Sequence, residues 1–268
     1  MLNANHYIPH KDVFFITLDS LRYDVAMQTL KAERTPNLAR VIPNGTWELR
    51  HTPATFTFAA HQAFFAGFLP TPAVTGRHSR LFAAKFEGSK TTSETTFVYS
   101  ESTWLEALKN LGYHTFCIGG VGFFRGTGGL SSVLPNFFEH SFFAPNMGVT
   151  SPRSTEKQVA RAVNLLHQIP DSERVLLFIN VSATHTPTRI FLPSATEDSI
   201  KTQAAALEYA DLHLGKLFEA FESRGGALCI VCSDHGEAFG EDSFYGHRLA
   251  HETVWNVPYA EFFLEGEP

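Results

Sequence analysis

The chain has 268 residues, of which 44% are hydrophobic and 18% are charged, and its formal net charge is -6 at pH 7. This length can bury one large core, and the acidic balance argues against nucleic acid or an acidic membrane surface as the main partner. No run is apolar for long enough to span a bilayer, and residues 1–12 lack the apolar core of a signal peptide, so we expect a cytoplasmic globular protein without a membrane anchor.

Apolar runs of strand length alternate with segments of helical period along the chain. In chain order the patterns predict a strand at 12–18, helices at 21–31, 35–41, 57–67 and 102–111, a strand at 114–118, a helix at 154–167, a strand at 174–181, a helix at 199–223, a strand at 227–232, a helix at 248–255 and a strand at 259–264. Residues 71–100 show no clear period and are expected to form an insertion near the site, and residues 119–152 are expected to be irregular. The alternation is typical of a doubly wound α/β fold with a mostly parallel central sheet and helices on both faces. Because no low-complexity linker divides the sequence, we expect a single domain over residues 1–268.

Residue types that bind metals follow two of the predicted strands. Asp19 stands directly after the apolar run 13–18, and Asp234 and His235 follow the run 227–232. In open α/β sheets the carboxyl ends of the strands form the edge where ligands bind. A carboxylate together with an imidazole at that edge suits a divalent metal with mixed oxygen and nitrogen ligands. The alternative for Asp234 and His235 alone is a polar turn that caps a helix.

Thr57 stands at the first position of the predicted helix 57–67. The free N–H groups and the dipole at a helix N-terminus favour negative charge, so an alkoxide or a phosphoryl oxygen would be stabilised there. Thr57 is therefore a candidate nucleophile. The alternative is that Thr57 is only the N-cap of the helix, a position at which threonine is common.

Further motifs occur in a fixed order over nearly the whole chain, and they comprise residues 16–24 (ITLDSLRYD), 35–38 (TPNL), 57–67 with Pro70, 185–187 (HTP), 209–211 (YAD), 233–247 and 257–258 (VP). In these motifs the chain resembles the alkaline phosphatase/sulfatase superfamily, and most of all a group of short, soluble bacterial sulfatase-like hydrolases. The resemblance implies an alkaline phosphatase-like fold. It also implies that Asp19, Thr57, Asp234 and His235 form the most constant metal site of the superfamily, in which the nucleophile is itself a ligand.

Two more histidines are assigned by the same resemblance. His185 matches a histidine that contacts the substrate or a second metal in the phosphoethanolamine-transferase branch, and His247 matches another histidine of that branch. His247 and His251 also have i, i+4 spacing, which on one helix face could chelate a metal. The alternatives for His251 are a histidine bonded to a carbonyl or a group beside the ligands. We predict His247 as a metal ligand and His185, His251 and Glu241 as substrate-binding residues, with His185 also catalytic.

The chain departs from sulfatases proper at the nucleophile. Those enzymes place a cysteine within Cys-x-Pro-Ser-Arg and convert it to formylglycine, whereas here Thr57 is followed by Phe58-Ala59-Ala60-His61. Threonine cannot become formylglycine, so that mechanism is excluded. Alkaline phosphatases also use a mid-chain Asp and His for a second zinc, and the stretch 180–185 contains no Asp. The sequence therefore leaves one or two metal ions as alternatives.

These residues together predict a metal-dependent hydrolase that cleaves a phosphate monoester or diester by attack of Thr57. The nitrogen ligands favour zinc or manganese over calcium. The expected partner is a small-molecule or peptide-borne ester. The alternatives are a sulfate or phosphonate ester hydrolase, a phospho-group transferase that uses the same site, and a non-catalytic binding or accessory protein on this fold.

Overall fold

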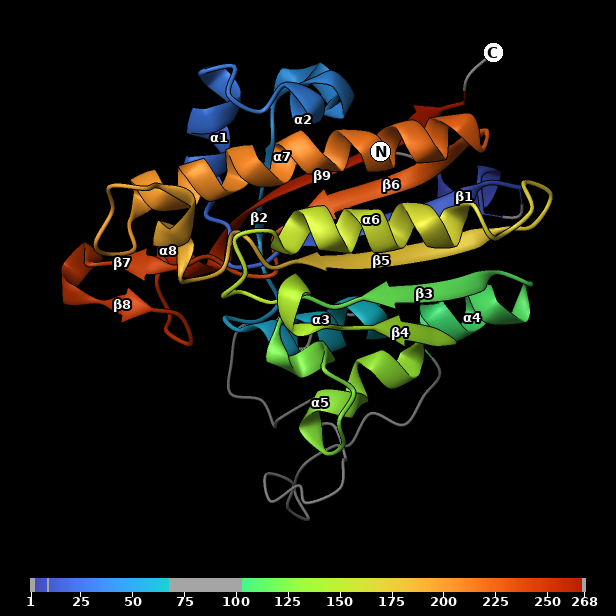
Figure 1. The fold of residues 1–268 in the computed structure, drawn as a ribbon, viewed down its shortest axis with the longest axis horizontal. Helices are drawn as coiled ribbons and strands as arrows, with labels where there is room; N and C mark the ends of the chain where they lie inside the picture. The colour runs from blue at the N-terminus through green and yellow to red at the C-terminus, as the bar shows by residue number, and fades with distance from the viewer. Residues whose placement is uncertain (1–2, 9, 68–102, 267–268) are drawn as a thin grey trace, which may run out of the picture.

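Seven strands form the central sheet of the computed structural model, which describes residues 3–8, 10–67 and 103–266 (Figure 1). The order across the sheet is β2 (Glu48–His51), β9 (Asn256–Glu265), β6 (Gly226–Cys232), β1 (Asp12–Leu18), β5 (Val175–Val181), β3 (His114–Ile118) and β4 (His140–Phe142). β1 pairs in parallel with β5 on one side and with β6 on the other, and β3 and β4 continue the parallel set. β9 runs antiparallel to both β6 and β2. β1 is therefore central, and its carboxyl end shares one edge of the sheet with those of β5 and β6.

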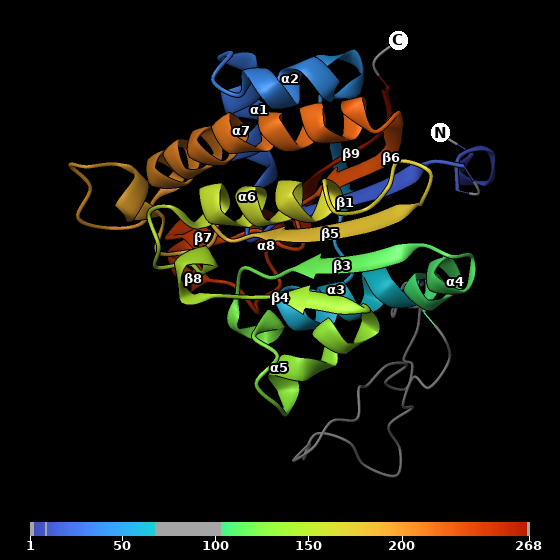
Figure 2. The ribbon, with the colours of Figure 1, turned by 45° about the vertical axis from the view of Figure 1, so that its right-hand side comes forward.

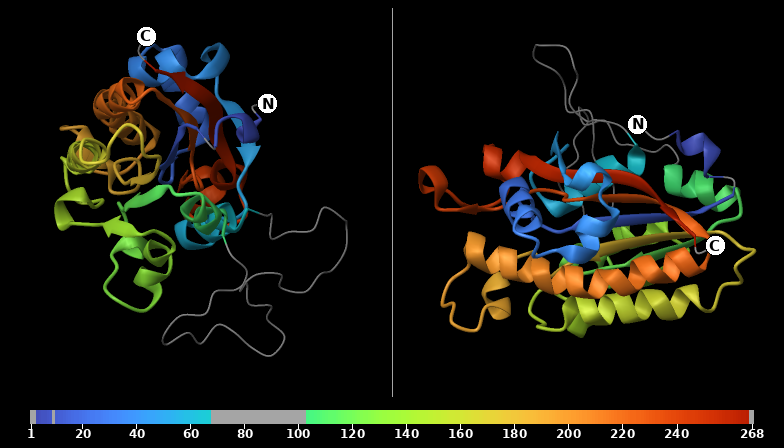
Figure 3. Two further views of the ribbon diagram at one scale, coloured as in Figure 1. Left: turned by 90° about the vertical axis from the view of Figure 1, so that its right-hand side faces the viewer. Right: turned by 90° about the horizontal axis from the view of Figure 1, so that it is seen from above.

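Helices cover both faces of the sheet (Figure 2 and Figure 3). One face carries α1 (Tyr23–Lys31), α2 (Pro36–Val41), α6 (Ser154–Leu166) and α7 (Ile200–Ser223), and the other carries α3 (Thr57–Ala66), α4 (Trp104–Asn110) and α5 (Leu130–Val133). Side chains of β1 alternate between the two cores, with Phe14, Ile16 and Leu18 on the first face and Val13 and Phe15 on the second. Because both faces are covered, β1 is buried along its whole length. Within the described ranges, no helix combines the length and hydropathy that crossing a membrane requires.

Helix α3 is held against β1 and β5 by aromatic side chains. Seven of its ten residues are buried, so it lacks the broad polar face of a surface helix. The ring centroid of Phe178 in β5 lies 5.1 Å from that of Phe65 and 5.5 Å from those of Phe15 and His61. Edge-to-face aromatic pairs contribute about 0.5–1.5 kcal/mol each beyond the area that they bury. This packing fixes the start of α3, at Thr57, beside the carboxyl end of β1.

The fold class predicted from the sequence is confirmed, and the strands predicted at 12–18 and 114–118 have the observed bounds. The strands β2 and β4 and the hairpin of β7 (Ala238–Phe239) and β8 (Tyr245–Gly246) are additional, because runs of two to four residues carry no periodic signal. β4 and α5 also give regular structure to part of the segment expected to be irregular. The expected insertion at 71–100 lies outside the described residues, and the single domain stays a prediction.

The helix predicted near 248–255 forms only over its second half. α8 spans only Glu252–Trp255, and Asn256 already belongs to β9. Arg248 has a φ of 68°, a left-handed conformation that an α-helix cannot contain, and His251 is the extended N-cap of α8. His247 and His251 therefore do not share a helix face, and the predicted i, i+4 pair does not form.

Candidate metal centre

Three acidic or imidazole side chains converge at the carboxyl edge of the sheet. Asp19 follows β1, and Asp234 and His235 follow β6, the strand that pairs with β1. Ligand atoms of the three residues lie within 4.8 Å of one another, and all three residues are fully buried. His235 Nε2 is 3.6 Å from Asp234 Oδ2 and 3.9 Å from Asp19 Oδ1. The structure thus brings together the candidate ligands from the two strand ends.

Within residues 3–8, 10–67 and 103–266, the carboxylates of Asp19 and Asp234 have no ion pair with a lysine or an arginine. Burial raises the pKa of Asp234 well above its ordinary value, and the charge of Asp19 raises it further. Burial also acts to raise the pKa of Asp19, but the imidazoles of His185 and His235 and the amide of Asn180 bring it below its ordinary value. Oδ2 of Asp234 is buried and accepts no hydrogen bond from the residues that the structure describes. A buried, unpartnered oxygen within a mixed oxygen and nitrogen donor set fits a divalent cation.

The backbone at the two strand ends orients these carboxylates. Ser20 has a φ of 61°, which is uncommon for a residue other than glycine. Its N–H donates to Asp234 Oδ1 and its hydroxyl to Asp19 Oδ1, each at 3.1 Å. Gly236 has to be glycine, because a Cβ there would lie 1.9 Å from the carbonyl oxygen of Thr253. The Asp-His-Gly sequence therefore lets the chain after β6 pass close to the backbone of α8.

Thr57 is the first residue of α3 and lies against His235. Its Oγ1 is 3.3 Å from His235 Nε2, and the residue is buried. Nδ1 of His235 donates to the carbonyl oxygen of Gly236 at 2.8 Å, so Nε2 carries the lone pair and can accept from the Thr57 hydroxyl. The N-cap of α3 is Phe56, and no side chain caps the helix. The alternative that Thr57 is only the N-cap is therefore wrong, and its role as nucleophile stays a prediction.

A second, more exposed group of side chains lies next to His235. The ring centroids of His235 and His247 are 4.5 Å apart, and those of His185 and His247 are 5.7 Å apart. Glu237 Oε2 accepts the Nδ1–H of His247 at 2.7 Å, and the ligand atoms of His235, Glu237 and His247 lie within 4.8 Å of one another. Nδ1 of His185 donates to the carbonyl oxygen of Thr186 at 2.6 Å. With their Nδ1 protons fixed in this way, His185 and His247 present Nε2 as the atom for a ligand or a metal.

Glu241 and His251, the other predicted substrate-binding residues, are engaged elsewhere. Glu241 forms an ion pair with the buried Arg22 at 2.5 Å. His251 accepts the N–H of Thr253 at its Nδ1, 3.2 Å away, and its Nε2 is 3.2 Å from the exposed Asp242. In the described part of the chain, neither side chain has a hydrogen bond or ion pair to the three buried candidate ligands. The structure therefore does not bring these two residues into the cluster.

Two polar residues of the site, Asn180 and His61, are not singled out by the sequence analysis. Asn180 Nδ2 donates to Asp19 Oδ2 at 2.8 Å, and His61 lies one helical turn after Thr57. Burial lowers the pKa of His61 to about 4 and that of His235 to about 3, so both imidazoles are neutral at pH 7. A signal is present in the sequence, because both Asn180 and His61 are polar residues within apolar segments, where burial is costly without a partner.

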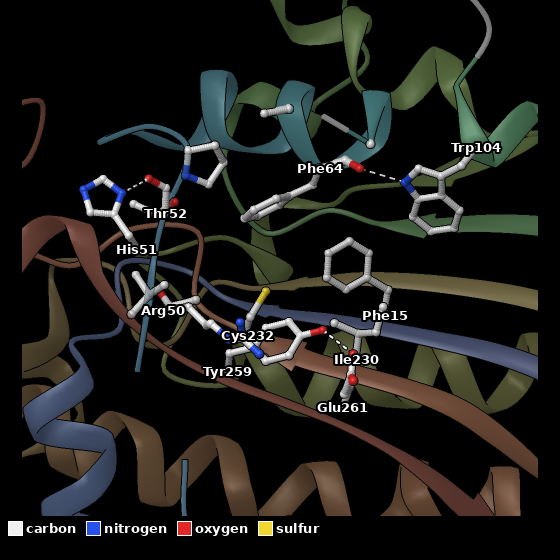
Figure 4. Close-up of a pocket in the computed structure, with 15 residues that line it drawn as sticks. Phe15, Arg50, His51, Thr52, Phe64, Trp104, Ile230, Cys232, Tyr259 and Glu261 are labelled. Carbon is white, nitrogen blue, oxygen red and sulfur yellow. Dashed lines mark hydrogen bonds between the residues drawn. The ribbon is translucent and has the colours of Figure 1, made fainter. Parts of the chain in front are cut away.

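A separate cavity of about 540 Å³ lies between α3 and the strands β1, β6 and β9 (Figure 4). Its lining is mostly apolar, with Phe15 on the sheet and Phe64 and Trp104 opposite it. The indole N–H of Trp104 donates to the carbonyl oxygen of Phe64 at 2.7 Å, and the Tyr259 hydroxyl donates to Glu261 at 2.8 Å. None of the predicted site residues lines this cavity, so it is not part of the candidate metal centre.

The fold and the buried cluster define an α/β protein with a site of metal-binding type at the carboxyl edge of its sheet. Residues 11–261 match the family model described as Sulfatase. The chain belongs to the sulfatase family, and its fold is that of the alkaline phosphatase/sulfatase superfamily, as the resemblance implies.

Three individual proteins show what this chain is similar to. The phosphoethanolamine transferase EptA of Helicobacter pylori is 28% identical over 131 residues, which cover 38% of this chain and only 25% of that protein. The C-terminal periplasmic domain of EcEptC from Escherichia coli, in complex with zinc, is 13% identical with a TM-score of 0.63, covering 96% of this chain and 73% of that chain. The putative sulfatase yidJ from Bacteroides fragilis is 17% identical with a TM-score of 0.65, covering 94% of this chain and 68% of that chain. The two structural likenesses show the fold.

Proposed function

We propose that this chain is a metal-dependent phosphoesterase with Thr57 as its nucleophile. The observation that carries the proposal is the 3.3 Å contact between Thr57 Oγ1 and His235 Nε2, within a fully buried cluster that includes Asp19 and Asp234. Burying two carboxylates side by side is costly, and strongly perturbed groups of this kind concentrate at functional sites. A helix N-terminus with only a structural role does not require two buried carboxylates beside it.

Four residues, Asp19, Thr57, Asp234 and His235, would hold the divalent ion. When bound, the ion supplies positive charge that favours the alkoxide of Thr57 and polarises a phosphoryl oxygen. Zinc and manganese suit this donor set. The complex of the EcEptC domain with zinc supports zinc as the first ion to test.

The proposed reaction proceeds in two steps on Thr57. Its Oγ1 bonds to phosphorus as the bond from phosphorus to the leaving alcohol oxygen breaks. Water then cleaves the phosphothreonine ester, which restores the hydroxyl and releases phosphate or, from a diester, a phosphate monoester. His185 and His247 would bind a second ion through the Nε2 lone pair or, where Nε2 also carries a proton, donate from it to a phosphoryl oxygen, because Nδ1 of each is already engaged.

Transfer of the phospho group to an alcohol acceptor is the second candidate. The similarity to a phosphoethanolamine transferase over 131 residues favours it. Water and a second alcohol can resolve the same phosphothreonine, so the site can serve either reaction. Attack on a sulfate or phosphonate ester would use the same residues, whereas an accessory protein would not need the Thr57 hydroxyl beside His235.

We also propose the class of substrate and the cellular location of the protein. A small-molecule or peptide-borne ester matches a nucleophile at the open edge of a sheet. We keep the cytoplasmic location proposed from the sequence, although the similar EcEptC domain is periplasmic.

The test is ester cleavage by protein loaded with zinc or manganese, with a chromogenic phosphate monoester, a phosphate diester and a sulfate ester in parallel. We expect a phosphate probe to be cleaved and an acid quench to trap phosphate on Thr57, detected by mass spectrometry. An added alcohol separates the two candidates, because transfer gives a new ester and hydrolysis does not. Cleavage by Thr57→Ala at the wild-type rate would remove Thr57 as the nucleophile. Metal binding without cleavage of any of the three esters would favour the accessory role.

A further inference from the structure

His61 is a fully buried imidazole that the proposed reaction does not use. It lies in α3 one turn after Thr57, and its Nδ1 is 2.7 Å from the carbonyl oxygen of Thr57. A carbonyl can only accept, so Nδ1 carries the proton and Nε2 carries the lone pair. Nε2 is 3.0 Å from the hydroxyl of Thr17, which must therefore donate to it. Both imidazole nitrogens are satisfied by one neutral tautomer.

The hydrogen bonds continue from Thr17 to the candidate ligand Asp19. Thr17 in β1 lies directly opposite Asn180 in β5. Asn180 Nδ2 donates one hydrogen to Asp19 Oδ2 at 2.8 Å and the other to Thr17 Oγ1 at 3.3 Å. The chain therefore has a single direction, from the Asn180 amide through Thr17 and His61 to the carbonyl of Thr57. Its two ends fix that direction, because the NH2 of the Asn180 side chain can only donate and the backbone carbonyl of Thr57 can only accept.

Packing alone does not explain an imidazole at this position. The ring of His61 lies among phenylalanines, with centroid distances of 5.2 Å to Phe124, 5.5 Å to Phe178 and 5.9 Å to Phe65. A phenylalanine would suit these neighbours without the cost of burying two polar nitrogens. The position is also the one at which Cys-x-Pro-Ser-Arg has its arginine, and here a neutral, hydrogen-bonded ring replaces that cation.

We propose that Thr17 and His61 are positioning residues for Thr57, because their hydrogen bonds tie the first turn of α3 to the strand end that carries Asp19. The inference rests on the proposed role of Thr57 and names the groups that hold this side chain in place. Partners that orient the ligands of a metal typically change metal affinity or activity by about 10–100-fold when they are removed. A displacement of a reacting group by about 1 Å can cost on the order of 100-fold in rate.

The experiment uses Thr17→Val, which keeps the shape of the side chain and removes the donor to His61. Thr17→Ser is the conservative variant, and Thr115→Val is the control, since Thr115 is an equally buried threonine of strand β3. Zinc affinity is measured by chelator competition in the wild-type and Thr57→Ala backgrounds. We expect Thr17→Val to lose about 10-fold in zinc affinity in the wild-type background, and little when Thr57 is already alanine. Thr17→Ser should restore most of the affinity, and Thr115→Val should not change it.

Kinetics and NMR give independent readings of the same positioning. On a phosphate ester, Thr17→Val should lower kcat by about 10–100-fold and leave KM within about 2-fold. In metal-free protein, ¹⁵N shifts should show the Nδ1–H tautomer of His61, and Thr17→Val should keep this tautomer, because the carbonyl oxygen of Thr57 still accepts the proton, but should shift the Nε2 resonance through loss of the hydrogen bond from Thr17. An equal loss of zinc affinity in both backgrounds, no loss at all, or an Nε2–H tautomer in the wild type would each overturn the proposal.

Failure of the proposed function has a different signature. If Thr57→Ala cleaves esters at the wild-type rate, Thr57 is not the nucleophile, whereas the zinc measurements and the tautomer of His61 still decide whether Thr17 and His61 position Thr57.

Discussion

Two groups of side chains meet at the carboxyl edge of the sheet. We call the first the inner site, which consists of Asp19, Thr57, Asp234 and His235. We call the second the outer site, which consists of His185, Glu237 and His247. The inner site is buried and stands on the ends of β1 and β6 and the start of α3. The outer site stands on the loop after β5 and around the β7–β8 hairpin, and the side chain of His247 is 21% exposed. Rigid elements place reacting groups most accurately, whereas loops tolerate variation. From this difference we expect the chemical step at the inner site and substrate recognition at the outer site.

Replacing the nucleophile is the most direct way to break this assignment. Thr57→Ala removes the hydroxyl 3.3 Å from His235 Nε2, and we expect kcat for a phosphate ester to fall by roughly 1,000-fold or more, because the covalent route is lost. Thr57→Ser keeps a hydroxyl and should retain part of the activity. Thermal stability should change little, because the N-cap is Phe56. Steady-state hydrolysis measures kcat, and thermal melts measure stability. An unchanged kcat would mean that water attacks the phosphorus directly.

Removing a carboxylate from the inner site should abolish the gain in protein stability that zinc provides. Zinc at about 100 times its Kd stabilises a protein by about 2.7 kcal/mol, and Asp234→Asn should lose most of this gain. Without metal, Asp234→Asn should be at least as stable as the wild type at pH 7. The reason is that the folded pKa of Asp234 is raised, so its ionisation costs stability as the pH rises through that pKa.

Thermal melts with zinc and with a chelator measure this difference. Asp211→Asn provides a contrast, because Asp211 is a buried carboxylate that accepts backbone N–H groups of α2, away from the inner site. That variant should respond to zinc as the wild type does. An equal zinc response in Asp234→Asn would remove Asp234 from the ligand set.

The inner site is the part that the sequence could predict. Asp19 and Asp234 each follow an apolar run, and parallel strands necessarily end at a common edge, so their meeting requires only that β1 and β6 be neighbours. Asn180 and His61 could not be assigned, because their hydrogen bonds depend on the register of β1 against β5 and on the packing of α3. The fold was predictable because long buried strands and helices carry a periodic signal in the sequence. The same signal marks the end of β1, which Asp19 follows.

The outer site was harder to predict because its geometry comes from irregular backbone. The left-handed φ of 68° at Arg248 directs the chain away from a helix, and nothing in the local sequence requires that conformation. Glu237 meets His247 only because the β7–β8 hairpin folds back. Sequence spacing favoured a helical pair of histidines, and tertiary contacts replaced it.

Truncating a side chain of the outer site should weaken binding of the phosphate ester and leave the metal in the inner site. His247→Ala removes an imidazole whose ring lies 4.5 Å from that of His235, and we expect KM for a phosphate ester to rise about 10-fold, the loss of one charge-assisted contact. Zinc affinity of the inner site should stay within about 2-fold, as measured by chelator competition. Glu237→Gln keeps a hydrogen-bond acceptor for His247 and should have the smaller effect on KM. A large loss of inner-site zinc in His247→Ala would show that the two sites bind metal as one unit.

The smallest effect is expected at His251, which the sequence analysis predicts to bind substrate. In the structure it is the N-cap of α8, and its Nδ1 accepts the N–H of Thr253 at 3.2 Å. His251→Asn keeps an acceptor of the kind preferred at an N-cap, so both KM and stability should stay near wild type, whereas His251→Ala should cost about 0.5–2 kcal/mol of stability through the lost cap. Urea unfolding gives the stability change and steady-state kinetics give KM. If His251→Asn raised KM as much as His247→Ala does, His251 would belong to the outer site. An unchanged KM together with destabilisation of the alanine variant alone would limit the outer site to His185, Glu237 and His247.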